Sequence, residues 1–140
     1  MLSLIFTLAF AGGFDLGIYN IVSGDGFSGY LGFHVEGNPF AARGRLIFGE
    51  AGGLTGGLDL LYRPLGDLII EPYLGAGAQT LIARQQSIGG LQMAVGEESY
   101  AVATLGIALR LPKIRPYIEI NYCYGADSYA KTGLGFVWWW

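Results

Sequence analysis

The sequence contains no apolar run long enough to form a membrane-spanning helix, although its composition is strongly apolar. Such a helix needs about 20 consecutive apolar residues, and the longest run, at the extreme N-terminus, is roughly half that length. Yet hydrophobic residues make up 52% of the 140 residues, and the mean hydropathy is +0.43. A closed β-barrel is the other structure that crosses a bilayer, because its backbone hydrogen bonds are all satisfied internally.

Cysteine and histidine are equally scarce, with one residue of each, Cys123 and His34. A single cysteine excludes an internal disulfide and a cysteine-based metal cluster, and a single histidine excludes a multi-histidine site. The net charge is −3 and no basic run occurs, which argues against nucleic acid as a partner. We therefore expect no metal and no cofactor, and most enzymatic hypotheses are weak.

The residues that are abundant favour strands and tight turns. Glycine occurs 24 times and aromatic residues reach 14%, a mixture typical of β-structure. Clusters of turn-forming residues recur at short intervals, and a longer connection covers about 83–99. They leave eight segments, most of them close to the 9–11 residues of a tilted transmembrane strand: 13–22, 27–36, 40–49, 54–63, 68–82, 100–111, 115–124 and 129–140. The spacing predicts an all-β fold, an eight-stranded antiparallel up-and-down transmembrane β-barrel in one domain over 12–140.

Apolar and polar side chains alternate within each segment. The charges of the segment cores share one face, and the segments that carry two charges test this independently: Arg43 with Arg45, Asp59 with Arg63, and Arg115 with Glu119. A soluble barrel, such as a lipocalin-like binding protein, would turn this polar face outward. An eight-stranded barrel is just wide enough inside to be filled by side chains, whereas the apolar face here is bulky and the polar face rich in glycine. This favours a membrane barrel with the apolar face in lipid.

Three short motifs resemble a known group of proteins. Residues 71–78, Glu-Pro-Tyr-Leu-Gly-Ala-Gly-Ala, resemble the P-Y-x-G-x-G strand of the small outer-membrane β-barrel superfamily with its OmpA/OmpX-type proteins. Residues 115–119 resemble a second copy, and residues 132–136 resemble the last strand of these barrels. The resemblance implies a bacterial outer-membrane location, contact with outer-membrane lipid, and recognition of the C-terminal aromatic residue by the barrel-assembly machinery. Trp140 stands where these proteins more often have phenylalanine.

The N-terminal residues 1–11 read as the apolar part of a secretory signal peptide that ends in Ala9-Phe10-Ala11. A first strand or a plug segment is the alternative. Intact-mass measurement of protein purified from membranes decides between them, because cleavage removes Met1 to Ala11. If the N-terminus lies in the periplasm, the long connection 83–99 falls on the outer side.

Charged side chains on the polar face form the candidate site. They would share the lumen, and we expect Glu71 and Glu119 each to contact at least one inward arginine or lysine. The nearly balanced signs favour a closed structural network over a gated ion path. Its predicted members are Asp15, Arg43, Arg45, Asp59, Arg63, Glu71, Arg110, Glu119 and Lys131.

The predicted function is therefore structural: a non-enzymatic barrel with a closed polar lumen that anchors or interacts with another envelope protein. The alternatives are a lipid-modifying outer-membrane enzyme or a narrow channel. One family of small outer-membrane barrels deacylates lipid A with serine, histidine and glutamate, so His34 with Ser28 or Glu36 is the residue set to consider. Ser28 lies six residues from His34 on one strand, roughly 20 Å away, too far for a nucleophile and its base.

Overall fold

The computed structural model describes residues 11–21, 27–37, 39–49, 53–65, 68–86, 90–93, 99–125 and 128–139. No helix long and apolar enough to span a membrane occurs in these ranges. The chain runs through strands joined by short connections, and their bounds are β1 (Ala11–Ile21), β2 (Phe27–Gly37), β3 (Phe40–Phe48), β4 (Gly53–Tyr62), β5 (Ile70–Gln86), β6 (Gly90–Met93), β7 (Ser99–Leu109), β8 (Ile114–Tyr124) and β9 (Tyr129–Trp139).

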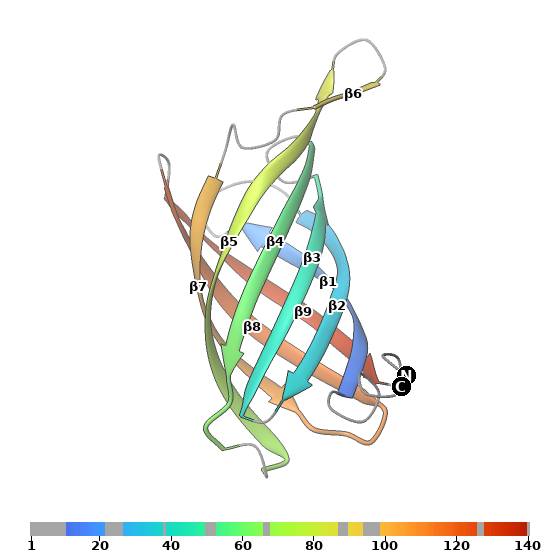
Figure 1. Cartoon of the computed structure of the whole chain (residues 1–140), viewed down its shortest axis with the longest axis vertical. Helices are drawn as coiled ribbons and strands as arrows, with labels where there is room; N and C mark the ends of the chain where they lie inside the picture. The colour runs from blue at the N-terminus through green and yellow to red at the C-terminus, as the bar shows by residue number, and fades with distance from the viewer. Residues whose placement is uncertain are drawn as a thin grey trace, which may run out of the picture.

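Eight of these strands close into a barrel. Each pairs in antiparallel fashion with its neighbour in the order β4-β3-β2-β1-β9-β8-β7-β5, and an additional β4–β5 pairing joins the two ends. The first and last strands meet through a register that runs from Gly13 opposite Trp139 to Ile21 opposite Lys131. Figure 1 shows the tilted strands wrapping around one axis, with the start of β1 and the end of β9 at the same end of the barrel. The predicted eight-stranded up-and-down barrel is confirmed.

The connection predicted for 83–99 differs from the structure. β5 extends to Gln86, and β6 folds back to pair with it over Ala83–Gln86. The β5–β7 ladder ends at Thr80 opposite Ser99, so the far end of β5 needs another partner for its backbone groups. The resulting hairpin stands beyond the rim of the barrel (Figure 1). Residues 1–10 of the predicted signal peptide and the C-terminal Trp140 lie outside the described residues.

The two faces of the strands separate apolar from polar side chains as predicted. Outward side chains are large and apolar: Leu105 is 64% exposed and Ile118 is 52% exposed. Inward side chains are buried, and they include Glu119 at 1% and Lys131 at 1%. Exposed apolar side chains around a barrel with a charged, buried interior are the arrangement that a lipid environment stabilises.

Four buried tyrosines fill the barrel, and each lies directly opposite a glycine on a neighbouring strand. The pairs are Tyr19 with Gly133, Tyr30 with Gly17, Tyr73 with Gly106, and Tyr117 with Gly135. The glycines make room for the rings: a Cβ atom on Gly133 would come within 2.8 Å of Tyr19 Cε1, and one on Gly135 within 2.7 Å of the Tyr117 hydroxyl. The inward glycines therefore set where the tyrosine rings lie, which is the cross-strand pairing of aromatic residue and glycine that stabilises sheets.

Candidate functional site in the barrel lumen

The lumen is organised around the carboxylate of Glu119, on β8. It accepts hydrogen bonds from Arg43 Nη1 at 2.7 Å and Nη2 at 2.9 Å, and from Arg45 Nη1 at 2.6 Å. Tyr73 donates to the same carboxylate at 2.7 Å and Asn121 at 3.0 Å. Charge-assisted bonds of this kind are short and strong, so one buried acid holds two arginines that come from β3.

The remaining donors of the two arginines bind two further acids. Arg43 Nε donates to Asp59 Oδ2 at 2.7 Å, and Arg45 Nε donates to Asp15 Oδ2 at 2.6 Å. Arg45 also donates to the Tyr117 hydroxyl at 2.7 Å, and its guanidinium lies 4.3 Å from the centre of the Tyr30 ring. A cation over an aromatic face is attracted to it, and here the rings also fill the space between charges.

Lys131 completes the charge balance of this central cluster, which comprises Asp15, Arg43, Arg45, Asp59, Glu119 and Lys131. Its Nζ donates to Gln79 Oε1 at 2.9 Å and lies 4.1 Å from the centre of the Tyr19 ring. With three acids and three bases, the cluster has no formal net charge. Paired and hydrogen-bonded charges are the condition under which ions are tolerated in a protein interior.

A second group of charges lies nearer the end of the barrel where β1 begins and β9 ends. We call it the terminal cluster: Glu36, Arg63, Glu71, Arg110 and Arg115. Arg63 and Arg115 both contact Glu36, Arg63 Nη1 lies 3.1 Å from Glu71 Oε1, and Arg110 Nε lies 3.7 Å from Glu71 Oε2. Arg110 is the most open of these side chains, at 36% exposure.

The structure thus places all nine predicted residues toward the lumen but divides them between two clusters. Both Glu71 and Glu119 contact inward arginines, as expected from sequence. Glu36 and Arg115 are members that the prediction left out. Their inward parity was the available signal, but each lies near a strand end, next to a turn.

Trp139 and His34 are two further inward residues that sequence reasoning did not place in the network. The Arg115 guanidinium lies 4.5 Å from the centre of the Trp139 ring, and the His34 ring meets the same indole edge-on at 5.2 Å. His34 Nε2 is 3.6 Å from Glu36 Oε1, longer than a hydrogen bond. These rings pack against the terminal cluster.

Toward the end of the lumen away from the start of β1, apolar and small side chains also face inward, beside buried polar ones such as Ser28, Thr55 and Gln79. These apolar and small residues lie near the strand ends, where the alternation places apolar residues on both faces, and all are buried: Ile47, Leu81, Ala83, Val102 and Cys123. Cys123 is fully buried and faces inward, as expected.

The residues that the sequence offered for a hydrolytic reaction, His34 and Ser28, lie apart on β2. The contacts of His34 within the described residues are with Glu36 and Trp139, whereas Ser28 lies opposite Tyr19 toward the other end of β2. No group of three or more potential metal ligands of the His, Cys, Asp and Glu types occurs among the described residues.

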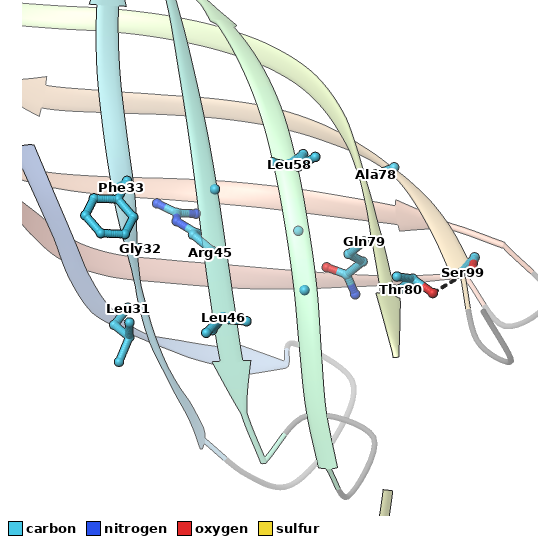
Figure 2. A pocket seen from close by; sticks show the side chains of 13 residues that line it. Leu31, Gly32, Phe33, Arg45, Leu46, Leu58, Ala78, Gln79, Thr80 and Ser99 are labelled. Atoms are coloured by element: carbon cyan, nitrogen blue, oxygen red, sulfur yellow. Dashed lines mark hydrogen bonds between the residues drawn. The ribbon is translucent and has the colours of Figure 1, made fainter. Parts of the chain in front are cut away.

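The outward surface contains a shallow apolar hollow of about 550 Å³ across β2, β3, β4 and β5. Gly44, Gly56 and Ala78 lower the surface between the larger side chains of Leu31, Phe33, Leu46 and Leu58. Figure 2 shows the hollow with the Thr80–Ser99 hydrogen bond at one end, between the two hydroxyl groups at 3.0 Å. Apart from Arg45, whose buried side chain lies in the lumen, the residues that line the hollow are uncharged.

Comparison with known proteins supports the fold and leaves the role open. No protein-family model matches the chain, and no curated protein matches it in sequence. Among solved structures, it is similar to the N-terminal β-barrel domain of Pseudomonas aeruginosa OprF, with a TM-score of 0.67 and 13% identity over 93% of this chain and 97% of that one. It is also similar to the Yersinia pestis outer membrane protein Ail, with a TM-score of 0.54 and 16% identity over 93% of this chain and 99% of that one. The chain therefore has the fold of small bacterial outer-membrane β-barrels, as the sequence resemblance predicted.

Proposed function

We propose that this chain is a closed, non-enzymatic barrel of the bacterial outer membrane that serves as an anchor and interaction module for another envelope protein. The observation that supports it best is the pairing of an apolar outer surface with a lumen whose charges are tied to one another. Glu119 binds both Arg43 and Arg45, and the remaining donors of these arginines bind two further acids. The residues that could carry chemistry are therefore engaged with one another.

The membrane part of this proposal rests on the exposed side chains. Phe14, Leu74, Leu105, Ile118 and Leu134 are each at least 51% exposed and come from five different strands. An apolar surface that surrounds the molecule would drive aggregation in water, whereas it matches the hydrocarbon band of a bilayer. Outer-membrane lipid is accordingly the first proposed partner, and the barrel-assembly machinery is the second.

Fractionation of membranes tests the location. The full-length protein, expressed in a Gram-negative host, should sediment with outer-membrane vesicles and stay there after extraction with urea. It should also migrate faster on a gel before heating than after heating, because a folded barrel resists detergent. Recovery in the soluble periplasmic fraction, or a mobility that heating does not change, would contradict a membrane barrel.

The interaction part of the proposal centres on the hairpin of β5 and β6. This hairpin extends beyond the rim (Figure 1), while β7 stops pairing with β5 at Ser99. A hairpin beyond the rim presents strand edges, and sheet edges are common sites of strand addition.

Replacing residues 84–98 by an Asn-Gly turn tests this role. The shortened variant should keep the heat-dependent gel mobility of the full chain, because the barrel strands are retained. Affinity capture from native membranes should recover an envelope protein with the full chain and not with the variant. Equal recovery by both would place the interaction elsewhere. Release of fatty acid from outer-membrane lipid by purified protein would instead favour the enzyme alternative.

A further inference from the structure

The junction between the central and terminal clusters contains a small cavity. Its volume is about 20 Å³, and it is lined by His34, Arg43, Leu61, Arg63, Glu71, Tyr73, Ala108, Arg115, Tyr117 and Val137. We propose that this cavity is the binding site of a single ordered water molecule, which joins the two clusters into one hydrogen-bonded network.

Four of the lining side chains carry buried polar atoms that make no hydrogen bond to another described residue. These atoms are the two ring nitrogens of His34, Nε of Arg63, Oε2 of Glu71 and Nε of Arg115. All four residues are more than nine-tenths buried. Leaving a buried donor or acceptor unsatisfied costs about 1–3 kcal/mol, so four unsatisfied side chains around one cavity indicate a small polar ligand.

The chemistry of these atoms selects water among small ligands. The arginine Nε atoms are donors, Glu71 Oε2 is an acceptor, and neutral His34 supplies one of each. Water both donates and accepts, and a buried water typically makes about three hydrogen bonds. An anion would satisfy the arginines but lie against the Glu71 carboxylate, and a cation would lie among three guanidinium groups.

The size of the cavity agrees with one water. A buried water needs at least about 10–15 Å³ of such space, so a cavity of about 20 Å³ holds one molecule. The lining includes Arg43, which donates to Glu119, and Tyr117, whose hydroxyl accepts from Arg45. A water here therefore lies between Arg43 of the central cluster and Glu71 and Arg63 of the terminal cluster.

A crystal structure of the full chain from crystals grown in sodium bromide tests the site directly. We expect one density peak within about 3.2 Å of at least two of the four unsatisfied side chains, with no anomalous signal at the bromine edge. An anomalous peak in the cavity would overturn the proposal in favour of an anion. A cavity without density, at a resolution that shows other buried waters, would overturn it as well.

Nuclear magnetic resonance of the unmodified protein in nanodiscs gives an independent test. The Nε–H groups of Arg63 and Arg115 should show cross-peaks to a long-lived water. The Nε–H of Arg45 is the matched control, because it donates to Asp15 and Arg45 does not line the cavity. Cross-peaks absent from both Arg63 and Arg115, or equally strong at Arg45, would contradict a water bound at this site.

Discussion

Glu119 is the residue on which the interior of this barrel depends most. Its side chain has no exposed surface. Its carboxylate binds two arginines from β3, which lies across the lumen from β8 with three strands between them on either side. Buried ion pairs gain little over apolar packing, but removal of one partner leaves an uncompensated buried charge. The acid is therefore costly to lose even if the pair adds little net stability.

Glu119→Gln is predicted to lower the free energy of unfolding by about 3–5 kcal/mol. The amide keeps the size of the side chain and removes the charge that offsets Arg43 and Arg45. Urea titration of the protein folded in lipid vesicles measures the change. Lys113→Gln is the control, since Lys113 lies exposed in the turn before β8 and its loss should change stability by less than about 0.5 kcal/mol. Equal midpoints for both variants would show that the network does not hold the barrel together.

The tyrosine–glycine pairs lead to a second prediction, on the stability of single glycine variants. Gly106→Ala is expected to destabilise the barrel by about 1–3 kcal/mol, because a Cβ there would come within 2.8 Å of Tyr73 Cε2. Gly29→Ala is the matched control on β2, where an added Cβ would meet no atom within 4 Å. The same urea titration compares them. If Gly29→Ala is as destabilising as Gly106→Ala, the cost comes from the backbone rather than from the ring.

At the level of the strand, alternation with a period of two decides which side chains meet lipid. β7 illustrates it: Thr104 is 4% exposed, Leu105 is 64% exposed and Ile107 is 50% exposed. Slipping a strand by one residue would turn its entire apolar face inward. The charged interior opposes such a slip, because arginines would then face hydrocarbon.

A charge placed on the outward face at the middle of a strand is expected to destabilise the barrel, because that face lies in lipid. Leu105→Arg should cost about 2–4 kcal/mol near the bilayer midplane, and Leu109→Arg at the end of β7 about 0–1 kcal/mol, since the penalty falls toward the interface. Both positions face outward. Folding yields and unfolding midpoints in vesicles measure the pair. A Leu105→Arg variant that folds as stably as the parent would overturn the assignment of the outward face.

At the scale of the whole molecule, closure of the sheet removes free edges from the barrel and leaves a narrow interior. Eight strands enclose little more than their own side chains. Four tyrosines, the paired charges, and apolar and polar residues at the end away from the start of β1 occupy that space. The lumen therefore holds paired charges in its middle and at the end where β1 begins, and a mixture of apolar and uncharged polar side chains at the other end.

The wild-type barrel is accordingly predicted not to conduct ions. Planar-bilayer recordings in 1 M salt should show no reproducible single-channel steps, because the Arg43–Glu119–Arg45 bridge and the apolar residues above it block the axis. A pore-forming protein reconstituted in the same way controls for insertion. Reproducible steps of uniform size from the wild-type chain would promote the channel alternative above the structural one.

Several features of this protein follow from the sequence by itself. Turn-forming clusters placed the eight barrel strands to within a few residues, because such residues interrupt extended segments wherever they occur. Alternation assigned Arg43, Arg45 and Glu119 to the lumen, since the faces of a strand are fixed by local geometry. The short motifs pointed to the class of barrel that the solved structures then matched.

Tertiary structure alone decided which of these residues meet. Arg43 and Glu119 are 76 residues apart in sequence, and their contact depends on the registers of every pair of strands between them and on closure of β1 against β9. The same registers place each tyrosine opposite a glycine and bring Glu36 to Arg63 and Arg115. The hairpin of β5 and β6 was likewise beyond the sequence pattern, because it forms where β7 stops pairing with β5. Alternation specifies a face, whereas partners across a lumen are specified by how the closed sheet aligns its strands.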